Sequence, residues 1–156
     1  MIHDLLPSPI GDVLVIGDDD GTLIGLWFAD CHAVPEGSRR ARLPDVSAQL
    51  DAYWSRDLSE FTLPLRFSGT TFQRAVWQAL ADVPYGTTLG YGELAARLGK
   101  PAASRAVGAA NGQNPISIVV PCHRLVGSTG ALVKYGGGLE RKRWLLDHES
   151  APRRAQ

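Results

Sequence analysis

The chain has 156 residues, of which 44% are hydrophobic and 21% charged, a composition typical of a globular protein of one domain or two small ones. It has no apolar run long enough to span a membrane, and its N-terminus lacks the basic and apolar segments of a signal peptide. We therefore expect a cytoplasmic protein without a membrane partner, in which Cys31 and Cys122 are free thiols.

The net charge is zero, but the charges are unevenly distributed along the chain. Residues 1–65 hold 4 Lys and Arg against 11 Asp and Glu, a net charge of −7, whereas residues 66–156 hold 12 against 5, a net charge of +7. This asymmetry predicts an acidic half and a half that binds a polyanion. The alternative, that the charges only keep both surfaces soluble, stays open at this point.

The first 35 residues favour β-structure. Apolar runs at Ile10–Ile16 and Thr22–Phe28 flank an Asp-Gly turn, which predicts a hairpin. The three aspartates of that turn lack the spacing of a calcium loop, and Cys31-His32 has no second Cys/His pair for zinc, so we expect no metal site.

A helix is predicted next, with Asp45 as its N-cap and Val46, Leu50 and Tyr53-Trp54 on one face, followed by a strand over Phe61–Phe67. Residues 1–67 are thus expected to form an α/β domain, an antiparallel sheet plus a helix. We find no residue in it that suggests chemistry and interpret it as a scaffold.

Residues 68–150 are predicted to form a second, mainly α-helical domain, with 151–156 as a disordered tail. Thr70 or Thr71 caps a helix with Phe72, Val76 and Leu80 on one face. Short helices over Glu93–Leu98 and Ser104–Asn111, joined by a Gly-Lys-Pro turn, indicate a helix-turn-helix, and a last helix runs over Leu139–His148.

The most informative stretch is Ile118–Val126. Its β-branched start predicts a buried strand that Pro121 ends, and Cys122, His123 and Arg124 follow at once. A thiol becomes a strong nucleophile as thiolate, which nearby imidazole or cationic groups favour. By itself, however, a lone cysteine beside a strand is more often a small buried hydrophobe.

The surrounding motifs decide between these interpretations. They are RAVG at 105–108, Asn114-Pro115, PCHR at 121–124 and YGGGLERKRWLLDHE at 135–149, preceded by FQRAVWQAL, VPYG and YGELAARLG. In this order and spacing the chain resembles the O6-alkylguanine-DNA alkyltransferases almost continuously from Phe72 to Glu149. The resemblance implies repair of double-stranded DNA by direct transfer of an alkyl group from guanine O6 to a cysteine, in a single turnover and without a cofactor, with O4-alkylthymine as a further candidate substrate.

The resemblance also implies roles for individual residues. Cys122 corresponds to the alkyl acceptor, and His123, oriented by Glu149, would take its proton through a water. Tyr91 would contact the flipped guanine and assist its departure, and Asn114 would brace the active-site turn. The pocket would include Leu125, Val133, Tyr135 and Gly136, with backbone of Cys122, Leu125 and Gly136 reading the guanine edge.

In the same comparison, Arg105 corresponds to a finger that fills the gap left by the flipped base. Ala106, Gly108 and Ala109 would let the recognition helix of a monomer approach the minor groove closely, although small residues suit packing on a neighbouring helix equally well. Four positions depart from the residues common in this family: Gly90, Leu125, Val133 and Lys134. These departures affect the expected shape of the pocket and not the catalytic roles.

Three rival hypotheses belong to other classes. A cysteine hydrolase is disfavoured because catalytic Cys and His normally come from distant parts of a chain. A non-catalytic binder like the alkyltransferase-like proteins would lack Cys122. A transcription factor using the helix-turn-helix alone would bind one sequence regardless of alkylation.

Overall fold

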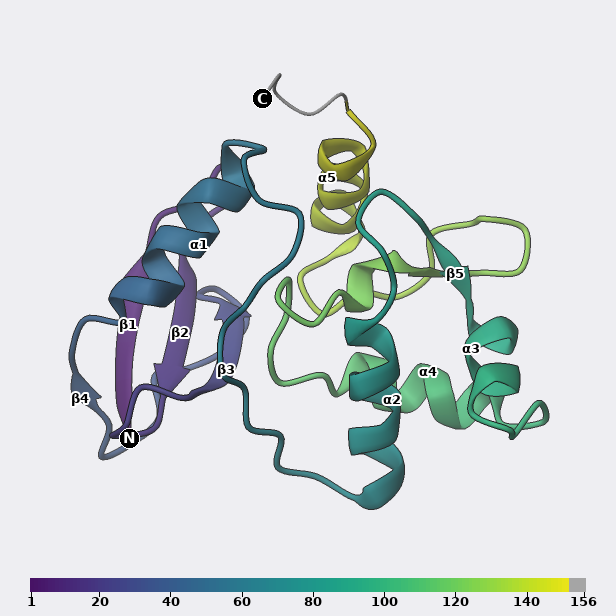
Figure 1. Cartoon of the computed structure of the whole chain (residues 1–156), viewed down its shortest axis with the longest axis horizontal. Coiled ribbons are helices and arrows are strands. Elements are labelled where there is room, and N and C mark those ends of the chain that lie inside the picture. The colour runs from purple at the N-terminus through teal and green to yellow at the C-terminus, as the bar shows by residue number, and fades with distance from the viewer. Residues whose placement is uncertain (152–156) are drawn as a thin grey trace.

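The computed structural model describes residues 1–151. Figure 1 shows two halves side by side, a sheet with one helix and a group of helices, joined by a long segment. The predicted fold class, an α/β part followed by a mainly helical part with a helix-turn-helix, is confirmed. In residues 1–151 no helix is long and apolar enough to cross a membrane.

The first half is built on a four-stranded sheet in the order β3-β2-β1-β4. Its strands are β1 (Ile2–Leu6), β2 (Val13–Gly17), β3 (Leu23–Phe28) and β4 (Arg39–Arg40). β2 pairs antiparallel with β1 and β3, and β4 joins β1 in parallel. The predicted hairpin is confirmed: Gly21 has φ +87°, and its N–H donates to the Asp18 carbonyl over 2.9 Å.

Helix α1 (Pro44–Trp54) covers this sheet with Val46, Leu50 and Tyr53 buried, as the periodicity predicted. The predicted N-cap is wrong, because Leu43 occupies that position and Pro44 starts the helix; Asp45 lies in the first turn. The predicted strand over Phe61–Phe67 is also wrong. The segment pairs with the sheet only through a bridge between Leu65 and Leu23, so it crosses between the halves as extended chain.

The second half contains α2 (Thr71–Ala81), α3 (Tyr91–Arg97), α4 (Ser104–Gly112) and α5 (Leu139–Ser150). Thr70 caps α2 through a reciprocal pair with Gln73, with N–H to oxygen distances of 3.1 and 2.9 Å. Helix α3 begins two residues earlier than predicted, because Glu93 accepts from the Gly90 N–H at its N-cap. The two-residue strands β5 (Leu89–Gly90) and β6 (Leu125–Val126) pair in parallel.

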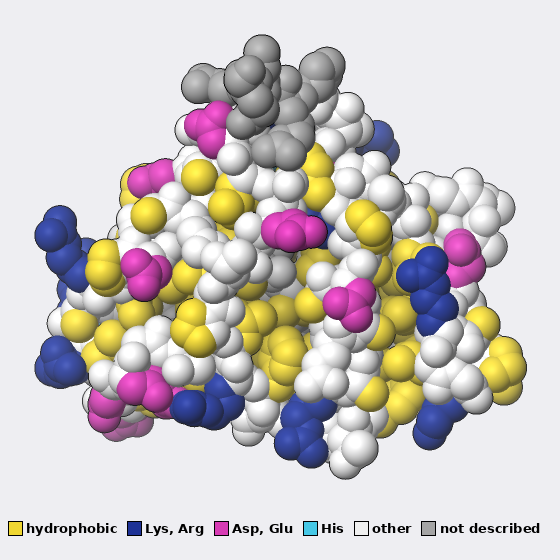
Figure 2. All heavy atoms as spheres, viewed as in Figure 1, with side chains coloured by type: hydrophobic (Ala, Val, Ile, Leu, Met, Phe, Trp, Pro, Cys, Tyr) yellow, Lys and Arg dark blue, Asp and Glu magenta, His cyan; other side chains and the backbone are white. Residues whose placement is uncertain are grey.

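One hydrophobic core joins the halves. It runs from the sheet (Val15, Leu26) through α2 (Val76, Leu80) to Leu145 of α5. On the face in Figure 2, basic and acidic side chains occur on both halves, so the charge asymmetry along the chain does not appear there as one acidic and one basic patch. The predicted tail, residues 151–156, lies outside the described part of the chain apart from Ala151.

Candidate active site

The segment before Cys122 is folded by the side chain of Asn114. Its Nδ2 donates to the Val120 carbonyl over 2.9 Å, and its Oδ1 accepts from the Ile116 N–H over 3.0 Å. Ile118 has φ +71°, which a strand does not permit, so the predicted strand over 118–120 is wrong. A tight turn stands in its place and presents Cys122 at the start of a 3-10 turn, η1 (Cys122–Arg124).

The sheet fixes this turn from the other side. Leu26 of β3 donates its N–H to the Pro115 carbonyl over 2.9 Å and accepts from the Ser117 N–H over 3.0 Å. The N-terminal half therefore anchors the backbone next to Cys122, since both of these bonds join β3 to the turn.

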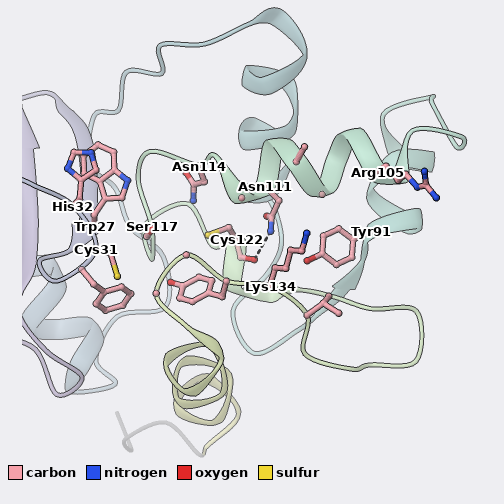
Figure 3. A pocket seen from close by; sticks show the side chains of 18 residues that line it. Trp27, Cys31, His32, Tyr91, Arg105, Asn111, Asn114, Ser117, Cys122 and Lys134 are labelled. Carbon is pink, nitrogen blue, oxygen red and sulfur yellow. Dashed lines mark hydrogen bonds between the residues drawn. The ribbon is translucent and has the colours of Figure 1, made fainter.

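Cys122 lines a cavity of about 970 Å³. Nine of the predicted site residues line it: Tyr91, Arg105, Gly108, Ala109, Asn114, Cys122, Val133, Tyr135 and Gly136. Figure 3 shows Cys122 in the middle, Tyr91 and Arg105 toward one end, and Trp27, Cys31 and His32 of the N-terminal half toward the other. Lys134 lies between Cys122 and Arg105 in this view, so its side chain belongs to the wall of the cavity.

Leu125 does not line the cavity. Its side chain is fully buried in the core, and its carbonyl accepts from Lys142 Nζ over 2.6 Å. Ala106 is exposed on α4 beside the cavity rather than in it. At Gly137 an added Cβ would lie 2.6 Å from the Phe28 ring, so the backbone approaches this ring too closely for a side chain.

His123 and Glu149 meet in a buried polar network. His123 Nε2 lies 2.8 Å from Glu149 Oε2, and both side chains are at most 1% exposed. Arg124 binds the same carboxylate in a bidentate manner, with Nε donating to Oε1 over 2.8 Å and Nη2 donating to Oε2 over 2.9 Å. Its Nη1 donates to the Val83 carbonyl. The three residues are thus one unit in which Arg124 fixes the carboxylate.

This network sets the protonation of its members. Burial alone would raise the pKa of Glu149, but His123 and Arg124 outweigh it and hold that pKa well below its usual range. Burial lowers the pKa of His123, and Glu149 partly offsets this effect. His123 is therefore a neutral imidazole near pH 7, with Nε2–H donated to Glu149 and Nδ1 left to accept a proton.

Burial raises the pKa of the Cys122 thiol, against the smaller lowering effects of a hydrogen bond from Asn114 and the positive charge of Lys142. We expected His123 to favour the thiolate, but desolvation of the sulfur is the larger effect on the pKa of Cys122. The resting side chain is a thiol, and it must lose its proton at the time of reaction.

Lys142 and Tyr53 were not foreseen as site residues. Lys142 is fully buried, and its Nζ donates to the carbonyls of Leu125, Val133 and Lys134 over 2.6, 2.9 and 3.4 Å. A signal existed, since Lys142 shares the inward face of α5 with Leu145 and Glu149 at helical spacing. Tyr53 reaches Glu149 from 96 positions away, which no local pattern reveals.

Helix α4, the second helix of the helix-turn-helix, presents mostly small exposed side chains beside the cavity. Arg105, Ala106 and Ala109 are exposed on α4, whereas Val107 and Ala110 point inward. A Cβ on Gly108 would lie 3.6 Å from the Tyr91 ring, in ordinary van der Waals contact, so α4 and the tyrosine are neighbours at this point. Within residues 1–151, no group of three or more His, Cys, Asp and Glu side chains is placed to hold a metal ion.

The comparisons with known proteins agree with this geometry. The family described as 6-O-methylguanine DNA methyltransferase matches through its ribonuclease-like domain at residues 1–67 and its DNA binding domain at residues 71–151. A methylated-DNA–protein-cysteine methyltransferase of Mycobacterium leprae is 47% identical over 96% of this chain and 93% of its own length. One from Methanosarcina acetivorans is 41% identical over 97% and 99%.

Among solved structures, Mycobacterium tuberculosis OGT in complex with DNA superposes with a TM-score of 0.92 at 41% identity, over 96% of this chain and 93% of that one. The O6-methylguanine-DNA methyltransferase of Pyrococcus kodakaraensis gives a TM-score of 0.71 at 25% identity, over 96% and 99%. The predicted resemblance is confirmed: the chain belongs to the 6-O-methylguanine DNA methyltransferase family, enzymes that repair DNA by transferring an alkyl group to a cysteine.

Proposed function

We propose that Cys122 is the alkyl acceptor and that the reaction is a single transfer from O6-alkylguanine in duplex DNA, with O4-alkylthymine as a further candidate substrate. The observation that supports this most strongly is the position of the thiol in a cavity of about 970 Å³ that reaches the exposed face of α4. A base turned out of a duplex needs such a cavity next to a DNA-binding surface.

The chemistry is a displacement at carbon. A bond forms between Cys122 Sγ and the alkyl carbon, the bond from that carbon to guanine O6 breaks, and the electron pair stays with guanine. The thiol proton passes to His123 Nδ1 through a water, and Glu149 stabilises the resulting imidazolium. The product is a thioether without a leaving group, so each molecule acts once.

Tyr91 and Asn114 support this step. Tyr91 is half-buried at the cavity wall, and burial raises the pKa of its hydroxyl, which keeps it a proton donor for the departing base. Asn114 keeps the turn before Cys122 closed through its bonds to Ile116 and Val120. Val133, Tyr135 and Gly136 form the wall against the alkyl group.

We propose that α4 docks in the minor groove through Ala106, Gly108 and Ala109, with Arg105 in the gap left by the flipped base. This is supported by the exposure of Arg105, Ala106 and Ala109 beside the cavity and by the way Arg105 extends from α4 in Figure 3. A groove-lining helix with small side chains reads little sequence, which suits an enzyme that must find damage anywhere.

We further propose a division of labour, with residues 1–67 as support and residues 68–150 as the DNA-binding and alkyl-transfer domain, acting as a monomer. We place the reaction in the cytoplasm, in line with the free thiols of Cys31 and Cys122.

Stoichiometry tests the proposal. With duplex DNA containing O6-methylguanine in excess, methyl transfer is expected to stop at one equivalent per protein. Cys122→Ala should abolish transfer and leave DNA affinity nearly unchanged, because the sulfur lies in the cavity and not on the α4 surface. Transfer by Cys122→Ala, or sustained turnover by the unaltered protein, would contradict it.

A further inference from the structure

A tyrosine of the N-terminal half reaches the polar network around His123. The hydroxyl of Tyr53, in α1, donates to Glu149 Oε2 over 2.6 Å, and His123 Nε2 lies 2.8 Å from the same oxygen. Tyr53 is fully buried. The half of the chain in which the sequence suggested no chemistry thus contacts the carboxylate that orients the proton acceptor.

The direction of this hydroxyl is fixed by packing. The Tyr53 ring lies against Trp54, His148 and Phe61, with centroids 5.0, 5.2 and 5.5 Å away. The backbone carbonyl of Tyr53 is in addition 2.8 Å from His148 Nε2 of α5. Because α1 and α5 are joined at this point, the hydroxyl cannot turn away from Glu149 without loss of packing.

Several other charged or titratable groups face this pair. They are Tyr85 after α2, Arg124 of η1, Tyr135 of the loop before α5, and Lys142 and His148 of α5. Among them Arg124 contacts both carboxylate oxygens. Arg124 therefore keeps Glu149 in place whether or not Tyr53 donates, and the hydroxyl changes mainly the charge that His123 experiences.

We propose that Tyr53 is a positioning residue for alkyl transfer: by donating to Glu149 Oε2 it limits how strongly the carboxylate stabilises a proton on His123. A donor on a carboxylate oxygen draws electron density from it, so the oxygen becomes a weaker partner for the imidazolium. His123 must be neutral to accept the Cys122 proton, so this donor extends the working range of the enzyme to lower pH. The inference rests on the proposed function of Cys122.

Tyr53→Phe removes the hydroxyl and keeps the ring. The carboxylate then favours the imidazolium more, the pKa of His123 rises, and the acid limb of the alkylation rate moves to higher pH by up to about one unit. Within that range the rate falls up to about tenfold, whereas at higher pH, where His123 is already neutral, the rate does not fall, because His123 is then the stronger base.

Two readouts test this in the full-length protein: NMR titration of the His123 ring, assigned by its absence in His123→Gln, and the pH–rate profile with O6-methylguanine duplex DNA. Trp54→Phe is the matched control, because it alters the same aromatic packing without contacting Glu149. We expect both readouts to shift upward in Tyr53→Phe and neither to shift in Trp54→Phe, although both variants lose thermal stability.

The outcomes separate the two claims. If the unaltered protein transfers methyl groups but Tyr53→Phe keeps the wild-type His123 pKa and rate profile, Tyr53 only packs the core and its proposed role is refuted. The same holds if Trp54→Phe shifts both readouts equally. If the unaltered protein transfers no methyl group to Cys122, the proposed function fails, and the role of Tyr53 in it fails as well.

Discussion

Lys142 offers the sharpest test of how the cavity is built. In Lys142→Met the side chain keeps its length, but the carbonyls of Leu125, Val133 and Lys134 lose a charged donor. A hydrogen bond to a charged group contributes about 1.5–3 kcal/mol, and a buried acceptor left without a partner costs about 1–3 kcal/mol. The variant no longer has to bury a charged ammonium, which offsets part of this cost. We expect a net loss of about 2–4 kcal/mol in the free energy of unfolding.

For a chain of this length that loss corresponds to a fall in melting temperature of about 4–16 °C. A second effect follows from charge: Lys142 lowers the pKa of the Cys122 thiol, so its removal should raise that pKa further and slow alkylation near pH 7. Thermal unfolding by circular dichroism measures the first effect. The pH dependence of iodoacetamide modification in a Cys31→Ser background measures the second.

Arg143→Met is the matched control, because Arg143 is the next residue of α5, is exposed, and shows no ion pair or hydrogen bond in the described structure. It should leave both measurements near the wild-type values. If Lys142→Met matched Arg143→Met in melting temperature and thiol pKa, the buried ammonium would not organise the loop that walls the cavity.

Three further predictions follow from the same structure. Arg105→Ala should slow repair of duplex DNA much more than reaction with a free O6-alkylguanine, as single-turnover rates on both substrates will show; equal losses would contradict the finger role. Glu149→Gln should destabilise the protein at neutral pH and slow alkylation, with partial rescue at higher pH. Because the folded pKa of Glu149 is lowered, its stabilising effect is complete above about pH 4.3 and is lost as pH falls below that value, so the variant should show a flatter acid limb in thermal unfolding than the wild type. The double variant Val133→Thr, Lys134→Gly should have a higher ratio of benzyl to methyl transfer rate than the wild type. Its DNA affinity should also depend less on salt, with a slope of log K against log salt concentration smaller by up to about one unit. An unchanged rate ratio and slope would show that these two residues are neutral variation.

The sequence was sufficient for what local pattern and motif spacing determine. The hairpin at Asp18–Gly21, the buried face of α1 and the Thr70 cap were all correct, because each depends on residues close together in the chain. The family resemblance assigned Asn114 to the turn before Cys122, where its side chain bonds to Ile116 and Val120, although the strand predicted over 118–120 was wrong. The β-branched run 118–120 favours a strand. In the structure, however, the side-chain amide of Asn114 donates to the Val120 carbonyl, and Ile118 adopts a positive φ, so the run forms a turn.

The parts that could not be predicted depend on contacts between distant segments. Tyr53 meets Glu149 only after α1 packs on α5, and the Leu26 bonds to the turn before Cys122 require the finished sheet. Phe61–Phe67 alternates like a strand, yet only Leu65 forms a β-bridge, to Leu23, because the segment crosses from one half to the other. In each case the tertiary packing, which periodicity does not encode, decided the structure.

The central claim is that Cys122 itself receives the alkyl group, and peptide mapping after reaction tests it most directly. Duplex DNA with an isotopically labelled O6-methylguanine should add one labelled methyl group to the peptide that contains Cys122, in proportion to the guanine repaired. The peptide that contains Cys31, the exposed thiol at the far end of the same cavity, should stay unlabelled. Label on Cys31, or repaired guanine without label on the protein, would contradict the account.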